Sequence, residues 1–207
     1  MNFFEQPQIE TKPVDLTKEK LALMQTLETE IEADFSVVMN GLRARTGADL
    51  QSRPDGYHLT IIGPTESKIL VDLNEQLLSE LQTINEQIKH SQGVVIKGVG
   101  FIDGANPALR MRAVDRVKKT AFISVEIPAL QEFRAKVGLP PKDFHVTLGF
   151  VGGDIHFQVV GQKPVKPGSP EMKDITAPIP KKADPNFSDI ELPAITFGAL
   201  NGQLKKK

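Results

Sequence analysis

A short phrase occurs twice in this chain, and its repetition limits the folds that the chain can adopt. The two copies are PDGYHLTI at residues 54–61 and PKDFHVTL at residues 141–148. In each copy a proline lies four residues before a histidine, an aromatic residue directly precedes that histidine, and a threonine follows two residues later. The chain has 4 histidines and 12 threonines, so chance predicts less than one such match. We infer that the chain is internally duplicated.

Both copies have the pattern of a β-strand. Aromatic and aliphatic residues alternate with the histidine and the threonine, and successive side chains of a strand point to opposite faces. The pair His58 and Thr60 should therefore project from one strand face, and the pair His145 and Thr147 from one face of a second strand. A polar face that becomes buried is costly unless it binds a ligand or finds hydrogen-bond partners.

Two such strands facing each other across a pseudo-twofold axis would present two imidazoles and two hydroxyls to a common cleft. This set of groups suits a phosphodiester, because hydroxyls donate hydrogen bonds to non-bridging oxygens. An imidazole with an ordinary pKa of about 6.5 can act as a base in one copy and as an acid in the other near neutral pH. The two motifs are nearly identical, so the sequence leaves open which histidine is the acid.

At these residues the chain resembles the two-histidine (2H) phosphoesterase superfamily, which includes 2',3'-cyclic nucleotide phosphodiesterases and relatives of bacterial 2'-5' RNA ligases. The resemblance covers residues 16–160. It implies an α+β, bilobal fold with two antiparallel β-sheets and flanking helices around a central cleft, duplicated about a pseudo-twofold axis. It also implies metal-independent catalysis without a cofactor, with His58 and His145 as catalytic residues and Thr60 and Thr147 as phosphate-binding residues.

The expected function is hydrolysis of a cyclic phosphate or a 2'-5'-type linkage in a nucleotide or short RNA by His/His acid–base catalysis. Two alternatives with the same site are a 2'-5' RNA ligase and a hydrolase of cyclic oligonucleotides. An alternative of another class is a non-catalytic RNA- or nucleotide-binding module. Turnover of a 2',3'-cyclic nucleotide in the presence of EDTA separates an enzyme from a binding module.

The composition of the chain restricts the kinds of molecule that the protein is expected to bind. A net charge of −1 in 207 residues disfavours an extended duplex nucleic-acid surface, which normally needs an excess of basic residues, and favours a nucleotide or short single-stranded RNA. No apolar run is long enough to span a bilayer, and the first residues lack the basic and apolar pattern of a signal peptide. We expect a cytoplasmic monomer with no membrane partner. The absence of cysteine excludes disulfides, cysteine zinc sites and thiol catalysis.

The remaining pattern predicts a helix and further strands near each motif strand, in the proportions of an α+β fold. Helices are expected over residues 17–35, 70–88 and 128–138, and strands over residues 57–62, 94–102, 109–114 and 120–127, followed by the second motif strand. The predicted domain organisation is a flexible N-terminal segment (1–15), a bilobal phosphoesterase-like domain (16–160), a proline- and lysine-rich linker or wrapping segment (161–190), and a terminal strand near 192–200 followed by a lysine tail (191–207).

Other charged residues are weaker candidates. Arg110 and Arg112 alternate with apolar residues, so both could lie on one strand face and contact substrate phosphate, or they could line a solvated edge. His90 and His156 lack a following threonine and are expected to be structural. A metal cluster of His145, Asp154 and His156 is conceivable, but these residues lack the spacing typical of metal ligands, so no metal site is predicted.

Overall fold

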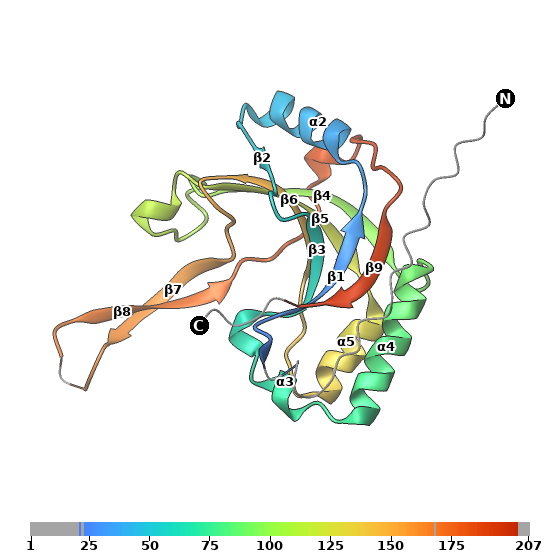
Figure 1. The fold of residues 1–207 in the computed structure, drawn as a ribbon. Coiled ribbons are helices and arrows are strands. Elements are labelled where there is room, and N and C mark those ends of the chain that lie inside the picture. The colour runs from blue at the N-terminus through green and yellow to red at the C-terminus, as the bar shows by residue number, and fades with distance from the viewer. Residues whose placement is uncertain (1–20, 22, 168, 203–207) are drawn as a thin grey trace.

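The computed structural model of the protein describes residues 21, 23–167 and 169–202, and these form an α+β fold with two antiparallel sheets. The large sheet has the strand order β4-β5-β6-β3-β1-β9, with the short β2 paired to β6, and β7 and β8 form a separate hairpin (Figure 1). The strands are β1 (Leu27–Glu32), β2 (Gln51–Ser52), β3 (Tyr57–Ile62), β4 (Val95–Asp103), β5 (Lys119–Glu126), β6 (Phe144–Val151), β7 (Phe157–Pro164), β8 (Met172–Pro178) and β9 (Thr196–Asn201). The helices are α2 (Ser36–Thr46), α3 (Ile69–Asp72), α4 (Glu75–Lys89) and α5 (Pro128–Lys136).

The two motif strands, β3 and β6, are adjacent at the centre of the large sheet. They run antiparallel, and their register places Leu59 opposite Val146. β1 continues the sheet beyond β3, and β5 continues it beyond β6. One motif strand with its neighbours therefore forms each half of the sheet, and the halves meet at this central pair. This arrangement confirms the predicted α+β fold with two lobes.

The central register also decides which residues face the core. Leu59 and Val146 are both fully buried and lie directly opposite each other, so they share one face of the sheet. α4 and α5 lie together on one side of the sheet (Figure 1), and α4 buries Leu78, Leu81 and Ile84. Because side chains alternate along a strand, the histidine and threonine of both motifs project from the opposite face. The face of the sheet opposite the helices is therefore available for a functional site.

The helix predicted over residues 17–35 is wrong over residues 27–32, which form β1. Its apolar residues recur every three or four positions, but the sequence LETEIE also alternates with a period of two. β3 pairs with one edge of this strand and β9 with the other, so tertiary pairing overrides the helical spacing. Residues 17–20 of that predicted helix lie outside the described part of the chain.

The strand predicted over residues 109–114 is also wrong. The segment is a loop with a single 3-10 turn at Ala113–Asp115. Met111 is buried in a small apolar cluster with Phe122, Ile155 and Ile179. The alternation of the sequence reflects this one inserted side chain and not a strand pairing, so Arg110 and Arg112 lie on a loop.

The predicted helix over 70–88 is divided into α3 and α4. Asn74 begins α4, because its side chain accepts a hydrogen bond of 2.9 Å from the backbone N–H of Leu77, as a helix N-cap does. The strands β4 and β5 and the helix α5 lie where the sequence predicts them.

The chain after β6 forms a β-hairpin and one further strand of the large sheet. β7 and β8 pair as an antiparallel hairpin that projects from the rest of the domain (Figure 1), and its prolines lie at strand ends, where a missing N–H is tolerated. β9 returns to the large sheet and pairs antiparallel with β1. The N-terminal segment 1–15 and the final lysines lie outside the described residues. None of the described helices has the length and hydropathy needed to cross a membrane.

Candidate active site

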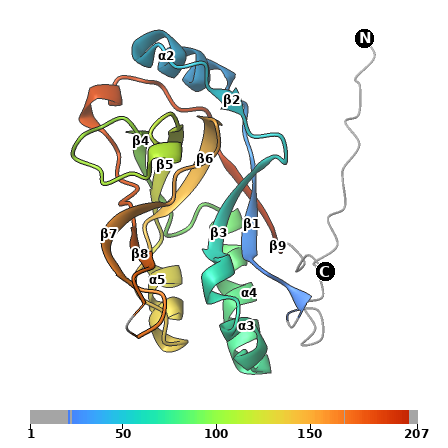
Figure 2. The ribbon, with the colours of Figure 1, turned by 90° about the vertical axis from the view of Figure 1, so that its left-hand side faces the viewer.

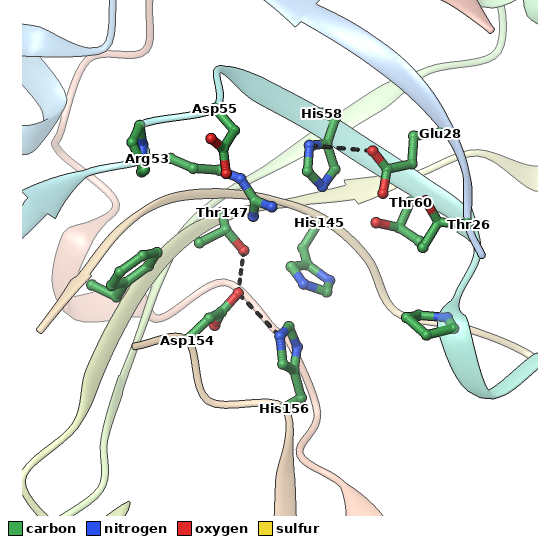
Figure 3. A pocket seen from close by; sticks show the side chains of 13 residues that line it. Thr26, Glu28, Arg53, Asp55, His58, Thr60, His145, Thr147, Asp154 and His156 are labelled. Carbon is green, nitrogen blue, oxygen red and sulfur yellow. Dashed lines mark hydrogen bonds and ion pairs between the residues drawn. The ribbon is translucent and has the colours of Figure 1, made fainter. Parts of the chain in front are cut away.

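A pocket of about 300 Å³ lies over the junction of β3 and β6. His58 and Thr60 line it from β3, and His145 and Thr147 line it from β6, so the structure brings all four motif residues together (Figure 3). The convergence follows from the register, since an antiparallel pair centred on two apolar residues places the flanking polar residues on one face.

The other sequence candidates are distributed differently. Arg110 and Arg112 do not line this pocket but a separate groove between the loop after β4 and the β7–β8 hairpin. His90 follows the last residue of α4 as its C-cap. His156, which was expected to be structural, lines the pocket together with Asp154.

His145 is held by a backbone acceptor. Its Nδ1 lies 2.9 Å from the carbonyl oxygen of Asp143, and its ring packs edge-on against Phe122 with centroids 5.9 Å apart. A carbonyl oxygen only accepts, so the Nδ1–H donates in this contact. In the neutral ring the other nitrogen, Nε2, then carries the lone pair, which is the form that a general base requires.

His58 is held by a carboxylate. Its Nδ1 lies 3.4 Å from Oε2 of Glu28, which projects from the neighbouring strand β1 (Figure 3). Burial raises the pKa of Glu28, although a hydrogen bond from Thr26 and the charge of Arg53 act in the opposite direction. A carboxylate at this distance stabilises an imidazolium once the ring is protonated. The two histidines therefore have different partners although their motifs are nearly identical.

Burial lowers the pKa of both histidines. The pKa of His58 falls to about 4 through desolvation and the nearby charge of Arg53. The pKa of His145 falls to about 3 through desolvation and the charge of Lys181. Both rings are thus neutral at pH 7 in the ligand-free protein. The departure from the ordinary pKa of about 6.5 arises from burial and two nearby cations, which the sequence did not reveal.

These pKa shifts predict that acidification destabilises the protein. Between about pH 6.5 and pH 4 an unfolded chain protonates its histidines while the folded protein keeps His58 and His145 neutral, so protons favour the unfolded state. The free energy of unfolding, measured by urea denaturation, should fall as the pH falls through this range. The fall should be shallower in the double variant His58→Gln/His145→Gln. The variant His90→Gln is the control, and equal slopes in the double variant and the wild type would contradict the prediction.

Asp154 connects the second motif to Lys181 and His156. Its Oδ2 accepts a hydrogen bond of 2.9 Å from Oγ1 of Thr147 and lies 3.5 Å from Nε2 of His156. Its Oδ1 lies 3.4 Å from Nζ of Lys181. Burial alone would raise the pKa of Asp154, but Lys181 and His156 outweigh it and keep the pKa below its ordinary value. The carboxylate is therefore charged and fixes the Thr147 hydroxyl.

Lys181 comes from the segment between β8 and β9 and is almost fully buried. Its ammonium donates a hydrogen bond of 2.7 Å to the carbonyl oxygen of Ile155 and lies 4.9 Å from the centre of the Phe122 ring. Burial lowers the pKa of Lys181, and the charge of Asp154 counteracts this effect. A residue far from the motifs in sequence thus supports the pocket.

Arg53 contributes a cation to the opposite wall of the pocket. Among the described residues, its Nε is a buried side-chain nitrogen for which no hydrogen-bond partner is found. Arg53 directly follows β2, and β2 approaches β6 so closely that a Cβ on Gly149 would lie 2.4 Å from the carbonyl oxygen of Gln51. Glycine after the second motif therefore permits the approach that carries Arg53 to the pocket. A guanidinium that lines the pocket suits a phosphate oxygen.

A buried ion pair joins the segments around both motifs. The guanidinium of Arg134, on α5, donates to the carbonyl oxygens of Ile61 (2.7 Å) and Pro140 (2.8 Å) and to Oε1 of Glu66 (2.6 Å). Ile61 directly follows Thr60, and Pro140 directly precedes the second copy of the phrase. The Arg134 side chain is 1% exposed. It fixes the position of one motif strand relative to the other.

Three pocket residues and one residue that supports the pocket were not identified from the sequence: Glu28, Arg53, Asp154 as a partner of threonine, and the supporting Lys181. Arg53 lies in the turn directly before the first motif, and a basic residue next to a phosphate-binding motif could have identified it. Glu28 and Lys181 belong to segments whose sequences give no sign of contact with the motifs. Within the described part of the chain, no group of three or more His, Asp or Glu side chains is arranged to hold a metal ion.

The matching family is described as the Swiss Army Knife, 2H phosphoesterase domain, and its model matches residues 30–156. The match spans more than half of the chain and includes both motif strands and the pocket residues Arg53 and Asp154. The protein therefore belongs to this 2H phosphoesterase family, which confirms the resemblance noted from the two motifs. Comparison with curated proteins found no match, and comparison with solved structures found none either.

Proposed function

We propose that the protein is a metal-independent phosphodiesterase that hydrolyses a cyclic phosphate or a 2'-5'-type linkage in a nucleotide or short RNA. The observation that supports this most directly is the pair of partly buried imidazoles, each with Nδ1 beside a different oxygen acceptor, in one pocket with two threonine hydroxyls. Membership of the 2H family supports a phosphoesterase.

The unequal partners of the histidines assign their roles. His145, whose Nδ1–H donates to a backbone carbonyl, is the base, and its Nε2 accepts a proton from water. The water oxygen bonds to phosphorus while the bond from phosphorus to one ribose oxygen breaks. His58 is the acid and donates its proton to that leaving oxygen, because the Glu28 carboxylate stabilises its protonated form. The anionic substrate raises the pKa of His58 on binding and so supplies the charge that the ligand-free site disfavours.

Three groups bind the phosphate in this scheme. Arg53 offers the positive charge of its guanidinium, and Thr60 and Thr147 offer hydroxyls from the two motif strands. In the ligand-free protein the Thr147 hydroxyl donates its one hydrogen to Asp154, so it donates to the phosphate only when this hydrogen bond is exchanged. Donors held at the phosphate in this way stabilise charge that develops on the non-bridging oxygens in the transition state.

A turnover assay tests the proposed function. The purified protein is incubated with 2',3'-cyclic nucleotides, 2'-5' dinucleotides and cyclic dinucleotides, each with and without EDTA, and the products are identified by chromatography. We expect release of a phosphomonoester from at least one substrate at a rate that EDTA does not change. Joining of RNA ends would support the ligase alternative, and binding without turnover would support the binding module. Loss of activity with EDTA and its return with zinc or manganese would overturn metal-independent catalysis.

Replacement of the threonines should weaken the phosphate contacts. Thr60→Val and Thr147→Val keep the side-chain shape but remove the hydroxyl, and a hydrogen bond to a charged group contributes about 1.5 to 3 kcal/mol. We expect kcat/KM for the best substrate to fall about 10- to 150-fold in each variant. Thr196→Val, at an exposed position of β9 outside the pocket, is the control. Unchanged kinetics in both variants would show that the threonines serve only the strands.

A further inference from the structure

A second hollow lies beside the active-site pocket, between the loop after β4 and the β7–β8 hairpin. Figure 2 shows this loop above the hairpin on the face turned toward the viewer. The hollow is an open groove of about 650 Å³, which we call the arginine groove. Its wall includes Arg110, Arg112 and Arg116 from the loop and Val159 and Gln162 from β7.

The arginine groove and the active-site pocket have a common neighbour. A smaller hollow of about 190 Å³ lies between them. This hollow shares Asp154 and His156 with the active-site pocket, and it shares Met111, Arg112 and Val159 with the arginine groove. A chain that enters the active site on the Asp154 side can therefore extend through the small hollow into the groove.

The walls of the groove are fixed to each other and to the sheet. The backbone N–H of Val159 donates a hydrogen bond of 2.8 Å to the carbonyl oxygen of Arg110, which joins the hairpin to the loop. Met111 packs in the small apolar cluster with Phe122 of β5, which joins the loop to the sheet. At the base of the hairpin, the backbone N–H of Ile179 donates a hydrogen bond of 2.9 Å to the carbonyl oxygen of His156. The groove is therefore part of the packed fold.

Positive charge is concentrated at this place. Residues 109–119 contain five basic residues and one acidic residue, in a chain whose net charge is −1. Three of these cations are paired, since Arg112 lies 3.3 Å from Asp174, Lys118 lies 2.6 Å from Asp115 and Lys119 lies 3.2 Å from Asp103. Arg110 and Arg116 are exposed, and no carboxylate of the described residues lies within ion-pair distance of either. Such a stripe of cations matches the spaced negative charges of a nucleic-acid backbone.

An exposed aromatic ring lies along the same path. Phe157, the first residue of β7, lines the small hollow and is 45% exposed, and its ring centroid lies 6.2 Å from that of His156. Exposure of a large aromatic side chain is unfavourable in water, whereas stacking on a nucleobase uses the ring face directly. An aromatic ring followed by arginines is the combination found in sites for single strands.

We propose that the small hollow and the arginine groove bind a single RNA strand whose terminal phosphodiester occupies the active-site pocket. This proposal rests on the proposed function and specifies its substrate class as an oligoribonucleotide rather than a free nucleotide. Phe157 stacks on a base close to the reacting phosphate, and Arg110 and Arg116 contact the phosphates that follow. The β7–β8 hairpin begins at residue 157, one residue after the family match ends, so the groove combines the family core with a segment outside that match.

Equilibrium binding tests the groove without requiring turnover. A fluorescein-labelled octaribonucleotide is titrated with the protein and followed by fluorescence anisotropy at several salt concentrations. We expect the double variant Arg110→Ala/Arg116→Ala to weaken binding about tenfold or more and to reduce the slope of log K against log salt by about 1.4, which corresponds to two lost phosphate contacts on a single strand. The control, Lys97→Ala/Lys136→Ala, removes the same charge from exposed side chains, on the end of β4 remote from the loop and on α5.

Phe157 is tested by a matched series. Phe157→Leu removes the aromatic face but keeps an apolar side chain, and it should weaken binding about fivefold or more, whereas Phe157→Tyr should bind like the wild type. If the assay of the proposed function shows turnover, kcat/KM for an octanucleotide ending in a 2',3'-cyclic phosphate should exceed that for the mononucleotide. That ratio should fall about tenfold in the double arginine variant.

The outcomes separate this proposal from the proposed function. Oligonucleotide binding that depends on the arginines, without turnover, would support the groove and overturn the enzyme. Turnover of mononucleotides and oligonucleotides with equal kcat/KM, together with equal binding by the arginine and lysine variants, would support the enzyme and overturn the groove. Equally tight binding of polyglutamate would show a general site for polyanions and would also overturn the assignment to RNA.

Discussion

His58→Ala and His145→Ala are each expected to lower kcat by about 10²- to 10⁴-fold, because each removes a group that transfers a proton in the transition state. Each ring is held through Nδ1 by its own partner, a backbone carbonyl for His145 and the Glu28 carboxylate for His58, so neither ring can easily replace the other. Because the two histidines act in the same step, the double variant should be little slower than either single variant.

A change of leaving group separates the two roles. A p-nitrophenyl phosphodiester releases an anion that needs no proton, so it should recover much of the rate in His58→Ala but not in His145→Ala. Circular dichroism shows whether each variant is folded, and His90→Ala, at the end of α4, is the matched control. Near wild-type rates in either single variant at saturating substrate would contradict paired acid–base catalysis, and recovery in His145→Ala alone would reverse the assigned roles.

Arg134→Met should lower the free energy of unfolding by about 3 to 5 kcal/mol, the range typical of breaking a buried ion pair by removing one partner. The substitution keeps most of the side-chain volume but leaves the Glu66 carboxylate and the carbonyl oxygens of Ile61 and Pro140 without their guanidinium donor. Since Arg134 fixes the two motif strands relative to each other, the folded fraction should also show a lower kcat.

Lys136→Ala is the matched control for this variant. Lys136 lies two residues after Arg134 on the same helix and pairs with Glu80 at an exposed position. Such surface pairs contribute about 0 to 1 kcal/mol to the free energy of unfolding. Urea denaturation measures both free energies. A loss below about 1 kcal/mol for Arg134→Met would mean that the network is not what holds the motif strands together.

The sequence was most informative where function and strand pattern coincide within a few residues. The phrases around His58 and His145 each contain the reactive group, the phosphate donor and the alternation of a strand, so they predicted the family, the α+β fold and the convergence of four side chains. The apolar spacing of α4 and the β-branched run of β5 were similarly local. Such patterns depend only on residues that are close together along the chain, so they can be recognised in the sequence itself.

The parts that sequence analysis missed depend on contacts between distant segments. β1 contains three glutamates and becomes a strand because β3 and β9 supply hydrogen-bond partners on both edges. Glu28 reaches His58 only through that pairing, and Lys181 reaches Asp154 from a proline-rich segment. The lowered pKa values of the histidines followed from burial, which has no counterpart in the local motif.

The position of β9 has a consequence for the order of events during synthesis. All four motif residues have been translated once residue 147 has been added, yet β1 still has an open edge until residues 196–201 pair with it, and Asp154 has no ammonium beside it until residue 181 arrives. Asn85 of α4 also bonds both to Thr29 of β1 and to the carbonyl oxygen of Gly198. Contacts over such separations close late and slow folding. The nascent chain therefore carries all four motif residues well before the last strand and Lys181 can take their places around them.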